Sequence, residues 1–130
     1  MEIDHVGYLV KKLEKAKEEF LALGYVEEGE CAYDPIRDID ILFLKNGVYR
    51  IELVAPRSQQ SVVWDTAKKL GNTPYHICYL CDDIEETAEQ MREKRFTPAS
   101  DILPAVACGD RRVCFLYHGA IGIIELLERE

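Results

Sequence analysis

The chain has 130 residues, enough for one domain whose hydrophobic core needs no disulfides. It carries 24 acidic and 16 basic side chains, and the net charge of −8 repels phosphate backbones and anionic membranes, so we expect neither nucleic acid nor membrane as partner. No apolar run approaches the roughly 18 residues of a membrane span, and Met1-Glu2-Ile3-Asp4 does not resemble a signal peptide.

The first half of the chain predicts a strand, a helix and three further strands. Residues 3–10 alternate as a strand does, and in 12–23 apolar residues recur at helical spacing until Gly24 ends the turn. Asn46-Gly47 predicts a hairpin between the last two strands. The three strands are expected at about 25–33, 38–45 and 48–54.

Residues 56–73 predict a connector that contains a short helix. Ser61 is expected to cap this helix and Gly71 to end it. Three of its apolar side chains are expected to be buried: Val62, Val63 and Leu70.

The second half repeats the order of the first. It predicts a strand at 75–81, a helix from Asp82 or Asp83 to about Lys94, and strands near 96–102, 111–117 and 121–127. The pattern is typical of an α+β fold with helices on one face of a mostly antiparallel sheet. We expect a single domain, 1–130, built from βαβββ modules at 1–55 and 74–130 and the connector 56–73.

The two halves correspond residue by residue. His5 and His76 are 76 − 5 = 71 positions apart, and Glu52 and Glu125 are 125 − 52 = 73 apart. Self-similarity at a fixed offset indicates internal duplication, here into two modules related by a pseudo-twofold axis. The other pairs at offsets of 71 or 72 are Leu13 with Ile84, Phe20 with Met91, Tyr25 with Phe96, and Phe43-Leu44-x-x-Gly47 with Phe115-Leu116-x-x-Gly119.

Strand alternation places these four polar side chains on one side of the predicted sheet. Ile51 and Leu53 share a face, and Glu52 points the other way; Glu125 likewise opposes its aliphatic neighbours. His5 and His76 also lie opposite the apolar face of their strands. A buried carboxylate must be paired, metal-bound or hydrated.

Four such residues at duplicated positions favour a metal site. Taken singly, each His is typical of a hydrogen-bonded core residue and each Glu of a solvated one. Together they predict one divalent ion per chain, and imidazole with carboxylate suits Zn, Ni, Co or Mn. His118, next to Gly119 in a predicted turn, is expected at the surface.

The five cysteines predict no disulfide framework. Their number is odd and most lie in apolar, strand-like runs, which is typical of reduced core residues in a cytoplasmic protein. Cys78 and Cys81 are three residues apart on a predicted strand and therefore face opposite sides of it, which disfavours a redox pair.

Residues 3–127 resemble the vicinal oxygen chelate superfamily (glyoxalase, bleomycin resistance, extradiol dioxygenase), and within it methylmalonyl-CoA epimerase-like proteins most. The resemblance implies paired βαβββ modules in a cup-shaped sheet with helices on its outer face. It also implies metal ligands at His5, Glu52, His76 and Glu125. The motifs that carry it are Ile3-Asp4-His5-Val6-Gly7, Ser61 with Leu70-Gly71 leading into Tyr75-His76-Ile77, and Val113-x-Phe115-Leu116 leading into Gly122-x-Ile124-Glu125-Leu126.

The sequence departs from both of the nearest patterns in this superfamily. Epimerases usually carry Gln where this chain has Glu52, whereas bacterial glyoxalase I uses the set His, Glu, His and Glu that is present here. Epimerases also place an acidic residue near the position of Ile36, with Asp34 and Asp38 only nearby in this chain. Residues 19–25 lack the aromatic pair and Leu-Gly-Met turn of glyoxalase I. The sequence therefore does not decide between the epimerase reaction and the glyoxalase I reaction.

The expected chemistry is proton transfer next to a metal-bound carbonyl. The ion would hold the carbonyl oxygen and stabilise the enolate or enediolate that forms. Glu125 is the expected general base and Glu52 its partner on the opposite face of the substrate, an arrangement that suits epimerisation. Arg37 or Arg50 could hold an anionic or thioester tail, unless each serves only as a structural residue.

Three functions are consistent with these residues. The first is a metal-dependent, epimerase-like isomerase acting on an acyl-CoA. The second is a glyoxalase I (lactoylglutathione lyase)-type enzyme acting on a thiol hemithioacetal, and the third is a non-catalytic drug-binding module. Extradiol dioxygenation is disfavoured because a fourth ligand at Glu52 would fill a position that oxygen chemistry needs. The superfamily further implies a homodimer, and strand edges also need covering.

Overall fold

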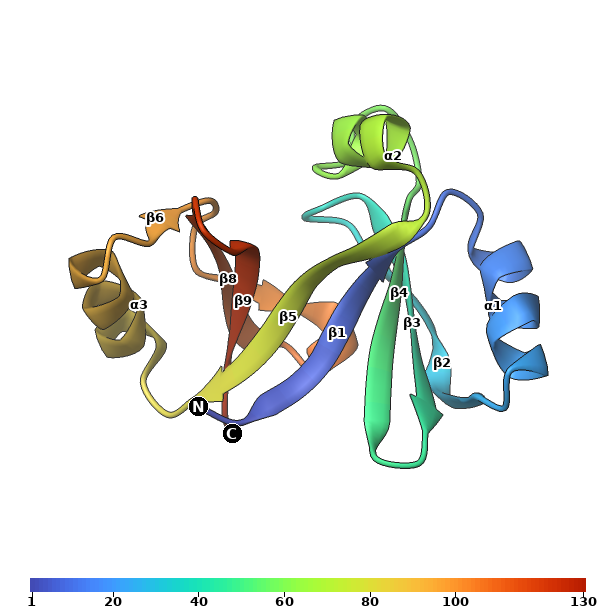
Figure 1. Ribbon diagram of the computed structural model, residues 1–130, viewed down its shortest axis with the longest axis horizontal. Coiled ribbons are helices and arrows are strands. Elements are labelled where there is room, and N and C mark those ends of the chain that lie inside the picture. Colours follow the sequence, from blue (N-terminus) through green and yellow to red (C-terminus); the bar gives the residue numbers. More distant parts are fainter. The chain divides into compact units, whose positions relative to one another are not determined.

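The computed structural model describes all 130 residues, in two compact units. We call His5–Tyr75 the first module and Met1–Asp4 with His76–Glu130 the second module. Figure 1 labels the elements, which are β1 (Ile3–Leu9), α1 (Leu13–Ala22), β2 (Val26–Asp34), β3 (Ile39–Asn46), β4 (Tyr49–Pro56), α2 (Trp64–Leu70), β5 (Thr73–Cys81), α3 (Ile84–Glu93), β6 (Thr97–Pro98), β7 (Leu103–Ala105), a 3-10 turn (Val106–Cys108), β8 (Arg111–His118) and β9 (Gly122–Glu128).

The sheet of the first module has the order β2-β3-β4-β1. β2, β3 and β4 are antiparallel, and β1 runs parallel to β4 with Val6 opposite Ile51. The predicted hairpin at Asn46-Gly47 is confirmed, because Asn46 pairs with Tyr49 across the turn. Gly47 has a φ of +63°, a left-handed conformation that glycine adopts without strain.

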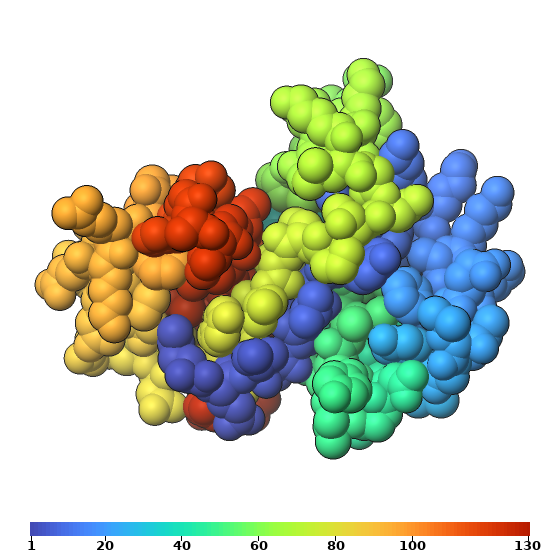
Figure 2. All heavy atoms as spheres, viewed as in Figure 1, coloured from blue at the N-terminus to red at the C-terminus, as the bar shows by residue number.

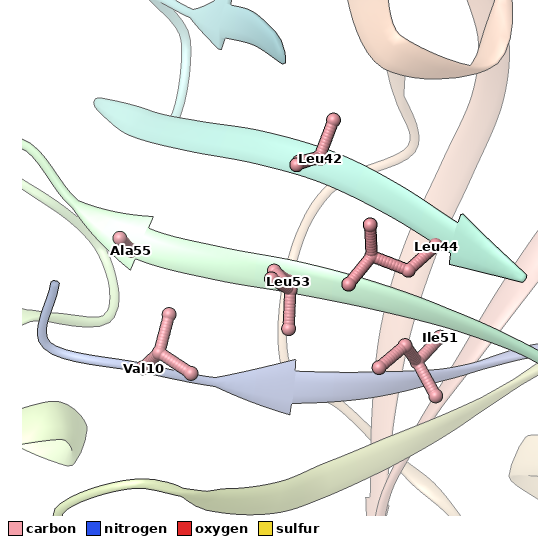
Figure 3. Close-up of a cluster of buried hydrophobic side chains, with 6 residues drawn as sticks. All are labelled: Val10, Leu42, Leu44, Ile51, Leu53 and Ala55. Atoms are coloured by element: carbon pink, nitrogen blue, oxygen red, sulfur yellow. The ribbon is translucent and has the colours of Figure 1, made fainter. Parts of the chain in front are cut away.

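Helix α1 covers one face of this sheet because both surfaces are apolar at matching positions. Leu13, Ala16 and Phe20 of α1 pack against the strands, and Phe20 meets Tyr8 edge to face at 5.0 Å between ring centroids. Burying these side chains removes apolar surface from water, which is the main force that holds the helix on the sheet. Figure 3 shows the buried cluster beneath it: Val10, Leu42, Leu44, Ile51, Leu53 and Ala55.

The second module repeats this arrangement. Its strands have the order β5-β9-β8-β6, with β5 parallel to β9 and the remaining pairs antiparallel. Ala88 and Met91 of α3 pack against its core. That core consists of Cys81, Ile84, Cys114, Leu116, Ile124 and Leu126. The α+β class and the mostly antiparallel strand pairing that the sequence predicts are therefore confirmed.

The N-terminal residues belong to the second module. The Leu80 N–H group donates a hydrogen bond of 2.9 Å to the Glu2 carbonyl oxygen, and the blue N-terminal atoms lie beside the yellow end of β5 in Figure 2.

Three sequence predictions about local structure are wrong: one strand, the start of the connector helix, and the burial of two of its side chains. Of the single strand expected at 96–102 only the short β6 forms, because Pro98 has no N–H group to continue a ladder, and β7 begins after that range. Between them Ser100 Oγ accepts the Phe115 N–H group at 2.9 Å, a bond that a regular strand would make with its backbone.

The connector helix also begins later than expected. Ser61 Oγ accepts the Val63 N–H group at 3.2 Å and so closes a turn before the helix, whose first residue is Trp64. Val63 is buried as predicted, but Val62 and Leu70 are 66% and 61% exposed. None of the helices combines the length and hydropathy that crossing a membrane requires.

Candidate functional site

In the second module, His76 and Glu125 lie side by side on two parallel strands. His76 on β5 comes two residues before Cys78, which is the register partner of Glu125 on β9. This offset brings His76 Nε2 to 3.1 Å from Glu125 Oε1. Both side chains are buried, and strand alternation turns Glu125 away from Ile124 and Leu126, which are in the helix-facing core.

The first module contains the same pair at the same places. His5 on β1 comes two residues before Gly7, the register partner of Glu52 on β4. His5 Nε2 lies 3.6 Å from Glu52 Oε1, and both side chains are buried. Ile51 and Leu53, the neighbours of Glu52, are in the core cluster under α1. In each module the predicted His and Glu therefore meet on the face opposite the helix.

A phenylalanine completes each pair, and we did not predict this role from the sequence. Phe43 is the register partner of Glu52, and its ring lies edge-on to His5 at 5.1 Å between centroids. Phe115 pairs in the same way with Glu125 and lies 5.2 Å from the ring of His76. The offset of 115 − 43 = 72 residues was the available signal. Each ring limits how its imidazole can turn.

Comparison with known proteins identifies the family. Residues 4–115 match the sequence model of the Glyoxalase/Bleomycin resistance protein/Dioxygenase superfamily. The chain belongs to this superfamily. The resemblance predicted from the paired His and Glu motifs is thereby confirmed.

Individual proteins of similar sequence or structure agree with this match. The mitochondrial methylmalonyl-CoA epimerase of Bos taurus is 27% identical over 127 residues, which cover 95% of this chain and 72% of the bovine protein. The structure of hypothetical protein BH1468 from Bacillus halodurans C-125 superposes with a TM-score of 0.84 at 25% identity, covering 99% of this chain and 94% of that one. Methylmalonyl-CoA epimerase of Streptomyces coelicolor, in complex with 2-nitronate-propionyl-CoA, has a TM-score of 0.82 at 22% identity, covering 98% and 96% of the two chains. The fold is that of the superfamily.

Each His–Glu pair has the chemistry of half a metal site. Imidazole nitrogen and carboxylate oxygen are common ligands of Zn and of neighbouring divalent metals. Two ligand atoms bonded to one ion at about 2.0–2.2 Å lie between about 2.8 and 3.6 Å apart for right-angled to tetrahedral geometry. The separations of 3.1 Å and 3.6 Å in the two modules fall within this range. The donor set therefore fits a divalent ion.

The two predicted substrate-binding arginines each have a carboxylate partner in the first module. Arg37 is buried, and its Nη1 lies 2.7 Å from Asp34 Oδ2. Arg50 Nη2 lies 2.6 Å from Glu28 Oε1, and its guanidinium stacks over Phe43 at 4.6 Å from the ring centroid. Through Phe43, Arg50 is linked to the His5–Glu52 pair, whereas Arg37 holds the turn after β2.

The turn that contains Ile36 carries no carboxylate at that position, as the sequence indicated. Ile36 is half exposed, and its N–H group donates to Asp34 Oδ1 at 3.0 Å. Asp38 accepts hydrogen bonds from the hydroxyls of Ser58 and Tyr33, and these bonds hold the pKa of the Asp38 carboxyl below its usual range. Asp34 therefore holds the turn, and Asp38 ties it to β2 and to the connector.

His118 and the buried cysteines contribute to packing. His118 is half-buried, its ring contacts that of Phe96 at 4.9 Å between centroids with a tilt of 52°, and its Nδ1 accepts the Ala120 N–H group. All five cysteines are free, and only Cys31 is exposed. Burial raises the pKa of the Cys114 thiol to about 11, so this thiol is protonated at neutral pH.

Proposed function

We propose that the two His–Glu pairs bind one divalent ion together and that the chain catalyses proton transfer next to a carbonyl group of its substrate. The observation that carries this proposal is the repetition of one local geometry, a buried His beside a buried Glu, in both modules. A site that uses all four ligands requires the two modules to act as one domain over residues 1–130. Duplication followed by joint use of both copies explains why neither module has lost its pair.

The bound ion would act as a Lewis acid that makes the carbon next to a carbonyl easier to deprotonate. Glu125 is the residue that we assign as general base, since a carboxylate beside the reacting carbon can accept its proton. Glu52 occupies the equivalent place in the first module and is assigned the return of a proton from the opposite face. Two bases on opposite faces are what an epimerase needs.

An acyl-CoA thioester is the substrate class that we favour. The bovine relative is a methylmalonyl-CoA epimerase, and the Streptomyces coelicolor epimerase was solved with 2-nitronate-propionyl-CoA. A thioester carbonyl makes the C–H group on the neighbouring carbon more acidic, and Glu125 would accept the proton that this carbon loses. Arg50, which stacks on Phe43 beside the His5–Glu52 pair, is the arginine that we assign to an anionic part of the substrate.

One residue favours a glyoxalase I-type reaction as the second candidate. Glu52 stands where epimerases usually have Gln, and its carboxylate gives the His, Glu, His and Glu set of bacterial glyoxalase I. A thiol hemithioacetal also loses a proton next to a carbonyl, so the same two glutamates would serve. The substrate rather than the chemical step separates the two candidates.

Deuterium exchange from solvent tests the proposal directly. The purified protein, supplied in turn with Zn, Ni, Co or Mn, is incubated in D2O with methylmalonyl-CoA and separately with the hemithioacetal of methylglyoxal and glutathione. We expect metal-dependent deuterium incorporation at the α-carbon of the acyl-CoA. Turnover of the hemithioacetal alone would favour the second candidate, and no exchange with either substrate under any metal would favour a binding module.

We also expect a symmetric homodimer with one metal site in each chain, as the superfamily resemblance implies. Light scattering at micromolar concentration measures the mass of the particle. A mass near the 14.9 kDa of one chain would contradict this expectation.

A further inference from the structure

A cavity of about 520 Å³ opens in the first module between α1 and the sheet. Its apolar wall includes Tyr8, Val10 and Phe20, and its rim carries the lysines 11, 12 and 15. Tyr8 and Val10 belong to the helix-facing side of the sheet, whereas His5 lies on the opposite side of the same strand. We call this space the lysine cavity, and it is distinct from the His5–Glu52 pair.

The lysines of the cavity are not committed to neighbouring carboxylates. Lys17, one turn further along α1, forms ion pairs of 3.1 Å with both Glu14 and Glu27. Lys11, Lys12 and Lys15 form no ion pair, and all three are exposed. Glu19 also lines the cavity, so the lining carries three positive charges against one negative charge, in a chain whose net charge is −8.

The second module shows that the fold does not require lysines at these places. The helices α1 and α3 begin 84 − 13 = 71 residues apart, so the cap Lys12 corresponds to the cap Asp83. The backbone at the two caps is nearly identical, with φ and ψ of −133° and 107° in one and −129° and 104° in the other. At the same offset Lys11 and Lys15 correspond to Asp82 and Glu86.

The charge at these three positions is therefore reversed between the two modules, although the backbone there is the same. Acidic side chains are favourable where a helix starts, and Asp83 accepts the Glu86 N–H group there at 3.0 Å. The lysines of the first module act against the stability of α1, so stability of the helix does not account for them. A second cavity of about 280 Å³ shares Lys11 and adds Lys68, which extends the positive surface.

The cavity also has the build of a ligand site. Its volume lies within the roughly 300–1,000 Å³ typical of small-molecule pockets, which combine an apolar wall with a few polar groups. The Lys11 N–H group donates to Asn72 Oδ1 at 2.9 Å, so the backbone at the rim is held in place. An apolar wall with a positive rim matches a molecule with an apolar tail and an anionic head.

We propose that the lysine cavity binds a small organic anion that carries an apolar tail. The anionic head would lie among Lys11, Lys12 and Lys15, and the tail against Tyr8 and Phe20. This ligand is separate from the substrate of the His–Glu pairs, and the proposal does not depend on the metal.

Calorimetric titration with four probes tests the chemistry of the site. Octanoate and octyl phosphate carry the same tail with different anionic heads, 1-octanol lacks the charge, and acetate lacks the tail. We expect at least one of octanoate and octyl phosphate to bind tenfold more tightly than 1-octanol and than acetate. Whichever of the two binds more tightly shows whether the site prefers a carboxylate or a phosphate head. Equal affinity for octanol and both anions would overturn the proposal. So would binding that disappears when metal is removed with EDTA, because the probe would then occupy the metal site.

A charge exchange between the modules locates the site. The double variant Lys12→Asp with Lys15→Glu gives α1 the residues that α3 carries, and should weaken anion binding at least tenfold. It should unfold at the same or a higher temperature than the wild type, so lost binding would not reflect lost folding. The matched control, Lys45→Asp with Lys94→Glu, makes the same change in charge away from the cavity and should keep affinity within twofold. Equal losses in both double variants, or none in the first, would contradict the proposed site.

Discussion

Glu125 Oε1 lies 3.1 Å from Nε2 of His76, two buried side chains on neighbouring parallel strands. The contact is repeated by Glu52 and His5 at 3.6 Å with the same offset in strand register. In each module the strand register brings the Glu beside the His, and strand alternation turns both side chains to the same face. A second copy of the module therefore contains a second copy of the pair. The candidate site is thus a direct product of the repeated fold.

The two glutamates are expected to differ in catalysis. At equal metal occupancy, Glu125→Gln should lower the rate of deuterium exchange into an acyl-CoA by a factor of roughly 10²–10⁴, the usual effect of losing a general base. Glu52→Gln should retain more exchange, since Glu125 alone can remove the proton and return a deuteron on its own face, and an amide oxygen at position 52 still offers a ligand atom. Exchange rates and metal content are measured on the same samples. The opposite ranking would assign the base to Glu52 and favour the glyoxalase-type reaction.

Equivalent core leucines should contribute comparably to stability. Leu53 and Leu126 are both 0% exposed and occupy corresponding positions beside Glu52 and Glu125. Leu53→Ala and Leu126→Ala should each lower the free energy of unfolding by about 2–5 kcal/mol, measured by urea denaturation. Leu23→Ala is the control, because Leu23 is 70% exposed and should change stability by no more than about 0.5 kcal/mol. A small effect at only one of the two core positions would mean that the modules are not packed alike.

The sequence predicted which His and Glu share a face within each module, because period-two patterns carry much information. Ile51 and Leu53 had to face α1, and this requirement alone directed Glu52 to the other side of β4. The matching pattern around Glu125 gave an independent copy of the same prediction. Repetition in this way turned two weak local patterns into one prediction of four ligands.

The errors came from contacts that no periodic pattern records. Beyond Pro98 the Ser100 hydroxyl takes the place of a backbone acceptor, and the Ser61 hydroxyl accepts the Val63 N–H group before the helix begins. The lysine cavity depends on how the rings of Tyr8 and Phe20 pack edge to face, which sequence spacing does not specify. All of these features depend on contacts in three dimensions.

The caps of α1 and α3 are expected to respond in opposite directions to substitution. Asp83→Ala should lower the free energy of unfolding by about 1 kcal/mol, because the Glu86 N–H group loses its acceptor. Lys12→Asp should raise it by about 0.5–1 kcal/mol by supplying a cap that α1 lacks. Both changes are measured by urea denaturation in low salt. A destabilising Lys12→Asp would show that Lys12 has a structural role in α1.

Stability should depend on the Asp38 carboxylate in acid. Hydrogen bonds from Ser58 and Tyr33 lower the pKa of Asp38 from its ordinary 3.8, so its carboxylate is favoured in the folded state. This contribution is complete above pH 3.8 and is lost as the pH falls through the lowered pKa of the folded protein. Asp38→Asn should therefore lower the melting temperature at pH 7 and match the wild type in stronger acid.

Asn is the suitable replacement because Asp38 has a φ of +55°, which Asn tolerates. Asp101→Asn, at an exposed position, is the control and should follow the wild type at every pH. A wild-type advantage over Asp38→Asn that is constant from pH 7 to pH 2 would refute the role of the carboxylate charge.

Metal content of the purified protein is the most direct measurement of whether the two modules share one ion. Elemental analysis of the wild type, after loading and desalting, should give about one divalent ion per chain. His5→Ala and His76→Ala lie in different modules, and each should lose most of that ion if all four side chains bind it together. Chelation should also lower the melting temperature of the wild type, since a bound ion stabilises the folded state. Two ions per chain with one lost in each variant would mean separate sites, and unchanged metal content in both variants would contradict the site altogether.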